Sequence, residues 1–152
     1  MSKNLRIVGL VSAFALLVLG LIPNPSLAAP DWDVVVVDER DQPVEGILVR
    51  ETWQNFAVEK QGHVSERTTD ATGRATFPTQ RTQYSVLSQL VGTLRAATSF
   101  NMHGGYDADS HAHVFALGKG LFGAANTDWK GSPPHLSSRI VVRSAILPGR
   151  SR

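Results

Sequence analysis

The chain contains no cysteine among its 152 residues. Structural disulfides, thiolate zinc sites and cysteine nucleophiles are therefore excluded. The sequence also lacks a Gly-x-Ser-x-Gly segment, which serine hydrolases use to present their nucleophile, and a glycine-rich phosphate loop that ends in lysine. A domain without cross-links depends on its apolar core, and roughly 120 residues can bury enough surface for that.

Basic residues form no run and no stripe in this sequence. The formal net charge is +2, but Lys3 and Arg6 lie in an N-terminal segment that has no acidic residue. Beyond that segment, 13 basic residues balance 13 acidic ones. Binding driven by phosphate charge needs a basic surface, so we do not expect a nucleic-acid partner.

The N-terminal segment has the three parts of a secretion signal. Lys3 and Arg6 precede an uncharged apolar run over residues 7–22, and a Pro-Asn-Pro break follows. Small residues then occupy the two positions that a signal peptidase reads, so cleavage is expected between Ala28 and Ala29.

The signal peptide is therefore expected to cover residues 1–28. The mature protein is then periplasmic or secreted, with no stable membrane span after cleavage. The alternative is an uncleaved anchor, because a run of this length is close to the roughly 17–25 residues that span a bilayer.

Short β-branched or alternating segments separated by turn residues predict a mainly β domain. The expected strands are residues 32–37, 44–56, 63–65, 74–77, 111–117 and 139–143. Such spacing is typical of an antiparallel β-sandwich, in which the last strand would pair with residues 111–117. The domain is expected to occupy residues 29–143, with a flexible tail over 144–152.

One segment has a different period. Tyr84, Leu87, Leu90, Val91 and Leu94 recur at spacings of three and four, which predicts an amphipathic helix inserted into the sandwich. An apolar stripe at helical spacing usually packs in a core, which favours burial of this face, and the alternative is a docking surface for a partner.

Three segments resemble the carboxypeptidase-regulatory-like, or prealbumin-like (transthyretin-like), domain family. They are the strand at residues 34–38, the Gln-Pro-Val-Glu-Gly-Ile-Leu-Val segment at 42–49, and the Thr-Asp-Ala-Thr-Gly-Arg-Ala-Thr-Phe-Pro segment at 69–78. Asp41-Gln42 stands where the family usually has a glycine.

This resemblance covers about a third of the chain, and Ile47 departs from the alanine that the family prefers. It implies an antiparallel, Ig-like sandwich of about seven strands and a non-catalytic role in binding or support. It transfers no catalytic residues, and fold alone does not give function.

A second hypothesis concerns metal binding. His111 and His113 are two residues apart on a predicted strand and therefore share one face. With His103 or Asp109 as a third ligand, they could hold a divalent metal ion. The alternative is a polar loop followed by two strand histidines, because His-x-His is a short pattern.

A third hypothesis concerns carbohydrate binding, in which flat aromatic faces stack on sugar rings. Trp129 lies in a loop rich in Gly and Pro and is expected to be exposed, and Tyr106 is a further ligand-binding candidate. Trp53 lies on the apolar side of its strand and is expected in the core.

Together these observations favour an exported, non-catalytic binding or assembly module of the cell envelope. Its partner would be an envelope protein or a glycan, and no cofactor is required. The alternatives are a metal-binding protein or metal-dependent enzyme that uses the histidine cluster, and a carbohydrate-binding module.

Overall fold

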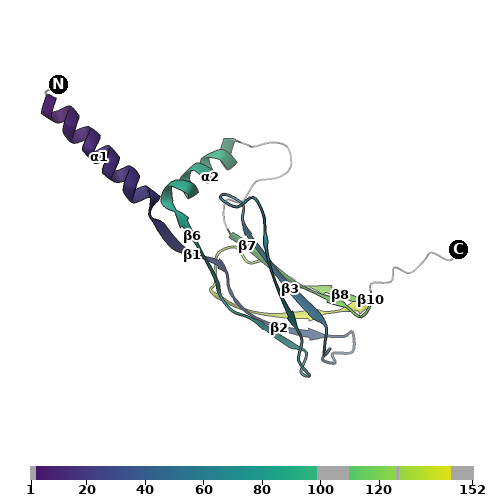
Figure 1. Cartoon of the computed structure of the whole chain (residues 1–152). Helices are drawn as coiled ribbons and strands as arrows, with labels where there is room; N and C mark the ends of the chain where they lie inside the picture. The colour runs from purple at the N-terminus through teal and green to yellow at the C-terminus, as the bar shows by residue number, and fades with distance from the viewer. Residues whose placement is uncertain (1–2, 99–109, 126, 145–152) are drawn as a thin grey trace.

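The computed structural model describes residues 3–98, 110–125 and 127–144 (Figure 1). The protein is mainly β, with mostly antiparallel sheets and two helices. The elements are α1 (Lys3–Leu21), β1 (Pro23–Ala29), β2 (Asp31–Val37), β3 (Leu48–Asn55), β4 (His63–Thr68), β5 (Arg74–Phe77), β6 (Gln80–Ser85), α2 (Val86–Thr98), β7 (Ser110–Gly118), β8 (Leu121–Ala124), β9 (His135–Val141) and β10 (Arg143–Ser144).

The described strands form three sheets. The largest has the order β10-β8-β7-β3-β4 and is antiparallel throughout. The second has the order β5-β2-β9, and β2 pairs with β9 in parallel. The third contains β1 and β6 alone, paired antiparallel.

One apolar core lies between the two larger sheets. In β2, Trp32, Val34 and Val36 point inward and are fully buried, while Asp31, Asp33 and Val35 are only partly buried. They pack in one cluster with inward residues of β7, such as Ala112 and Val114. Burying each large apolar side chain contributes about 1.5–3 kcal/mol. The strands predicted at residues 32–37 and 111–117 are thus confirmed.

The turn before β5 forms as its sequence predicts. The Asp70 carboxylate accepts hydrogen bonds from the backbone N–H of Thr72 (2.8 Å) and of Arg74 (2.9 Å). Gly73 adopts φ +73°, and a Cβ there would lie 2.5 Å from the carbonyl oxygen of Val36. Glycine is therefore required at this close approach.

The last strand pairs differently from the prediction. Residues 139–143 were expected beside residues 111–117, but β9 lies beside β2 and only the short β10 reaches β8. The reason is topological, because the chain crosses to the other sheet between β8 and β9. Ser144 belongs to β10, and the remainder of the expected tail lies outside the described residues.

At the N-terminal end, α1 projects from the sheets with its apolar side chains exposed from Ile7 onward (Figure 1). It ends at Leu21, immediately before the expected Pro-Asn-Pro break. This exposed apolar helix is consistent with a signal peptide. Within the part of the chain that the structure describes, no helix meets the length and hydropathy needed to span a membrane.

Helix α2 forms close to the predicted position, but its apolar face is not in the core. Val86, Leu90, Val91 and Leu94 are 55–58% exposed. The expectation of burial is wrong because α2 extends beyond the sheets and lies next to the end of α1 (Figure 1). The side of α2 that carries Gly92 lies against the β3–β4 connection. A Cβ on Gly92 would lie 2.1 Å from the Ala57 carbonyl oxygen.

Candidate functional site

A hollow of about 370 Å³ lies where β1, the β3–β4 connection, α2 and the start of β7 meet. Its lining side chains are small or uncharged. They belong to Ser26, Leu27, Asn55, Ala57, Gln89, Thr93 and Ser110, with Gly131 at one edge. Among the described residues, the hollow therefore offers hydroxyl and amide groups for hydrogen bonds, and none of the lining side chains carries a formal charge.

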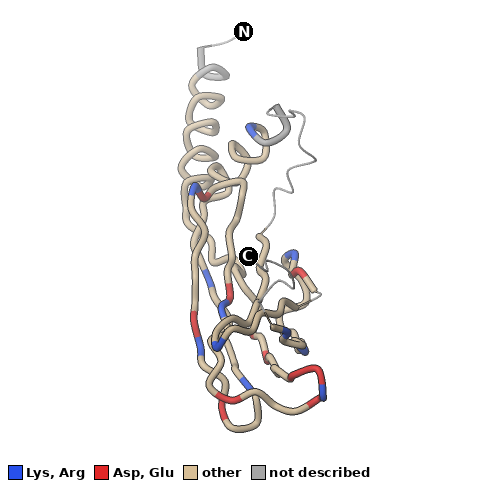
Figure 2. Tube along the Cα trace, turned by 90° about the vertical axis from the view of Figure 1, so that its right-hand side faces the viewer, with Lys and Arg blue, Asp and Glu red and all other residues tan. Residues whose placement is uncertain are grey.

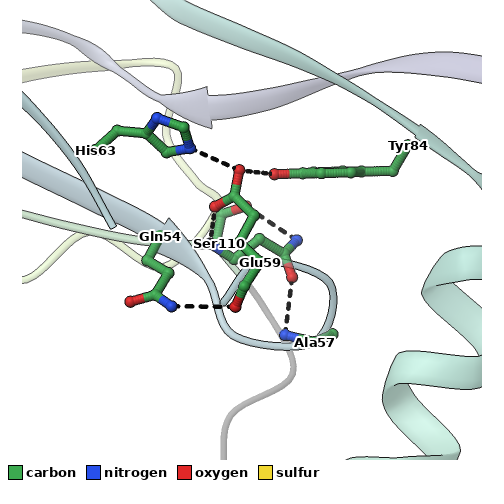
Figure 3. A network of polar contacts seen from close by, with 7 residues as sticks. Gln54, Ala57, Glu59, His63, Tyr84 and Ser110 are labelled. Carbon is green, nitrogen blue, oxygen red and sulfur yellow. Dashed lines mark hydrogen bonds and ion pairs between the residues drawn. The ribbon is translucent and has the colours of Figure 1, made fainter. Parts of the chain in front are cut away.

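Next to this hollow, the carboxylate of Glu59 is the centre of a network of polar contacts, which Figure 3 shows. Glu59 accepts a short hydrogen bond from the Tyr84 hydroxyl, and its Oε1 also lies 2.9 Å from His63 Nε2. Its Oε2 accepts from the backbone N–H of Asn55 at 2.7 Å. Glu59 therefore joins the β3–β4 connection to β6.

These contacts set the protonation of the Glu59–Tyr84 pair. Burial alone would raise the pKa of Glu59, but donors from Tyr84, Asn55 and His63 outweigh burial and leave that pKa below its ordinary value. Burial and the hydrogen bond to Glu59 together raise the pKa of Tyr84 to about 12. At neutral pH the pair is thus a carboxylate and a neutral phenol.

Asn55 connects the Glu59 network to the lining of the hollow. Its side-chain oxygen accepts from the Ala57 N–H at 3.0 Å, and its amide nitrogen donates to Ser110 Oγ at 3.3 Å. Gln54 Nε2 donates to the Glu59 carbonyl oxygen at 3.1 Å (Figure 3). Two residues of the lining, Asn55 and Ser110, are therefore held in place before any ligand arrives.

Helix α1 carries Lys3 and Arg6 near its start and is uncharged from Ile7 to Leu21. Figure 2 shows Asp, Glu, Lys and Arg residues spread over the strands and turns of the sheet region. The hollow lies between these two regions.

The histidines predicted as metal ligands are only partly accounted for. His111 and His113 both lie on the outward face of β7, at a small hollow of about 80 Å³. His113 Nδ1 is 3.9 Å from Asp128 Oδ1, and His111 contacts the Phe56 ring edge-on. Among the residues described, no group of three or more His, Cys, Asp or Glu side chains is placed to hold a metal.

Three predicted site residues, His103, Tyr106 and Asp109, lie outside the described residues. Nothing in the structure bears on their proposed roles. The metal hypothesis therefore stays a prediction.

Trp129 is not the exposed aromatic that its loop predicts. Its side chain is 1% exposed, and its ring nitrogen donates to the Pro133 carbonyl oxygen at 2.6 Å. Backbone hydrogen bonds to Ala112 in both directions draw the loop against β7. A buried indole has no face for a sugar ring, so the expectation for Trp129 is wrong. Trp53 is partly buried and packs against the core.

The expected cleavage position lies inside a strand. Ala28 and Ala29 are both buried near the end of β1, where β1 pairs with β6. A peptidase cannot reach this bond in the folded chain. Cleavage there requires that the segment be extended and unpaired, as it is before the domain folds.

Two features escaped the sequence reasoning. The alternation in β3 places Glu51 on the inward face, and the structure buries it completely (0% exposed) with neither carboxylate oxygen in a hydrogen bond. Burial raises the pKa of Glu51 to about 7. The second feature is the Glu59 network, whose members are spread over a polar loop, β4 and β6. No sequence spacing links them, although a lone Glu between two strands gave a weak signal.

No protein-family model matches this chain, and no curated protein matches it. The function of this protein is therefore inferred from its sequence and from the geometry described above.

Proposed function

We propose that this chain is an exported, non-catalytic binding or assembly module of the cell envelope. Its first 28 residues act as a secretion signal, and the rest forms a prealbumin-like sandwich with one inserted helix, as the resemblance at residues 34–78 implies. The mature protein is periplasmic or secreted. Its partner is an envelope protein that presents neutral, hydrogen-bonding groups.

The observation that carries this proposal is the part of the hollow that the mature chain keeps. Ser26 and Leu27 leave with the signal, and the described residues that remain are Asn55, Ala57, Gln89, Thr93, Ser110 and Gly131, none of which is charged. The wall of the hollow is ordered in advance by Asn55 and Ser110, so a ligand loses little free energy in organising the site. Side-chain amides and hydroxyls recognise peptide groups and neutral polar side chains through hydrogen bonds. The apolar face of α2 continues this surface toward α1.

The same geometry is poorly suited to acid–base chemistry. A general base works best when its pKa lies near the working pH. Glu59 has a lowered pKa and its oxygens are already occupied by Tyr84, His63 and Asn55. Tyr84 holds its proton with a pKa of about 12. These groups support the site's shape rather than a proton transfer.

A second candidate function, metal binding, rests on the shared face of His111 and His113. A third ligand would have to come from residues such as His103 or Asp109. The test is to purify the protein without chelator and measure bound metal. Stoichiometric metal that is lost in a His111→Ala/His113→Ala variant would favour this candidate over the first.

Export is tested by fusing residues 1–30 to a reporter enzyme that is active only outside the cytoplasm. We expect activity from the fusion and none when the apolar run is interrupted by Leu16→Arg and Leu17→Arg. An inactive wild-type fusion contradicts the export part of the proposal.

Binding is tested by crosslinking in intact cells. The chain has no cysteine, so Thr93→Cys places a unique thiol for a photoreactive label at the hollow. Arg40→Cys is the matched control, exposed in the β2–β3 connection at the other end of the sheets (Figure 1). We expect one discrete envelope-protein adduct from position 93 and none from position 40. Equal labelling from both positions contradicts the proposal.

A further inference from the structure

The pairing of β1 with β6 bears directly on what export does to this protein. Six positions of β1 pair with β6, from Pro23 opposite Ser85 to Ala29 opposite Gln80. Cleavage before Ala29 would remove five of these six positions. In the described residues β6 has no other strand neighbour.

The removed segment behaves as a protective cover for the β6 edge. Pro23 and Pro25 have no N–H, and proline is tolerated in a strand only where its nitrogen faces away from the ladder. Alternate residues of an antiparallel strand face the partner, so Asn24 and Ser26 are the ones that face β6. The prolines thus remove two donors from the outer side of β1 and leave that of Leu27, and proline on an edge strand is a known way to hinder further strand addition.

Strand β6 is also held by contacts that do not involve β1. The Tyr84 hydroxyl is hydrogen-bonded to Glu59, and β6 follows directly from β5, which pairs with β2. At its other end β6 leads into α2, whose Gly92 lies against Ala57. These contacts do not involve residues 23–28, so β6 remains extended when they are removed.

We infer that the β6 edge of the mature protein is an acceptor for an extended strand from a partner protein, and that residues 23–28 occupy this acceptor site only in the precursor. Added strands gain affinity from main-chain hydrogen bonds and specificity from side chains that enter pockets. This inference rests on the proposed export and cleavage, and it names the kind of partner.

The chemistry of β1 specifies the partner strand. Residues 23–29 are uncharged, and Leu27 packs against the core cluster while Ser26 and Leu27 line the hollow. The partner strand should therefore be neutral, run antiparallel to β6, carry a branched apolar residue at the Leu27 position and a small polar residue before it.

The test uses the protein as cells export it. Its N-terminus is read by intact mass, and a fluorescent peptide with the sequence of residues 22–29 is titrated by anisotropy against the exported protein and against the full-length precursor. We expect saturable binding to the exported protein and none to the precursor, whose edge is occupied.

Matched peptides separate strand pairing from adhesion. N-methylation at Ser26 removes a donor that faces β6 and should weaken binding at least about fivefold, since one hydrogen bond contributes about 1 kcal/mol. N-methylation at Leu27 removes a donor that faces away and should change binding less than twofold. A Leu27→Asp peptide should not bind.

The other outcomes overturn either this inference or the proposed function. If the exported protein begins at Ala29 but neither binds the peptide nor distinguishes the two N-methyl forms, the inference is overturned while export stands. If the exported protein retains residues 23–28, the edge is permanently covered and the inference is also overturned. If the protein is not exported, the proposed function itself fails.

Discussion

At one end of the molecule, the inward faces of β2, β3 and β7 meet in a dry core that contains Trp32, Val49 and Val114. At the other end, α1, β1, β6 and α2 are joined by a two-stranded ladder and by the polar contacts of Glu59, with apolar side chains of both helices left exposed. The first end is stabilised by buried area and the second by a few specific contacts. This difference agrees with our inference that the first end maintains the fold while the second exchanges one strand for another.

The largest effect should come from the core end. Trp129→Ala removes a fully buried indole and its hydrogen bond to Pro133, and we expect a loss of about 3–5 kcal/mol in the free energy of unfolding. Leu90→Ala on the exposed face of α2 is the control, with a change within about 0.5 kcal/mol. Chemical denaturation measures both. Similar losses for the two variants would erase the contrast between the ends.

Glu51 makes the core end sensitive to pH. Its pKa is about 7 in the folded protein against an ordinary value of 4.5, so between these pH values the unfolded chain loses a proton that the folded chain keeps. The free energy of unfolding should therefore fall by about 3 kcal/mol as pH rises from 4.5 to 7, and stay level above 7.

Glu51→Gln should remove this decline, as measured by denaturation at several pH values. Glu59 contributes in the opposite sense, because its pKa is lowered and its stabilisation is lost only as pH falls below 4.5. A variant that keeps the wild-type decline between pH 4.5 and 7 would show that another group causes it.

Gly92 lies where α2 meets the β3–β4 connection, so a substitution there tests that contact. In an isolated helix alanine is favoured over glycine by about 1 kcal/mol. Here a Cβ would meet the Ala57 carbonyl oxygen, so we expect Gly92→Ala to destabilise the protein by about 1–3 kcal/mol. Thr93→Ala, next along the helix and exposed, should be neutral or slightly stabilising. Stabilisation by Gly92→Ala would mean that α2 does not rest on this connection.

The smallest of these effects concerns the Glu59 network. Tyr84→Phe removes a donor to a largely buried carboxylate and should lower the free energy of unfolding by about 1–2 kcal/mol, with a higher pKa for Glu59. Thr76→Val removes a hydroxyl from an exposed carboxylate, Asp33, and serves as the control with a change below about 0.5 kcal/mol. Equal effects would show that the network does not order the wall of the hollow.

The sequence predicted the core end well because local pattern and burial agree there. Residues 34–37 are β-branched, which is typical of a strand. The Asp70–Gly73 turn follows from backbone chemistry alone. Pairing between distant segments was less accessible. Nothing in the pattern of residues 139–143 distinguishes a parallel place beside β2 from an antiparallel place beside β7.

The candidate site was predicted poorly for physical reasons. A Gly- and Pro-rich loop suggests exposure, yet two backbone hydrogen bonds to Ala112 pull Trp129 into the core. The stripe on α2 suggests burial, yet the helix extends past the sheets. Glu59 and Tyr84 meet only in the folded structure, so their contact cannot be predicted from their spacing in the sequence.

We infer that export converts the β1–β6 ladder from a closed edge to an open one, while the core end stays the same. Backbone hydrogen exchange of the precursor and the exported protein tests it directly. We predict slow exchange for Thr82 and Tyr84 in the precursor and fast exchange in the exported form, with β2 and β7 equally slow in both. Equal protection of β6 in the two forms would contradict the claim.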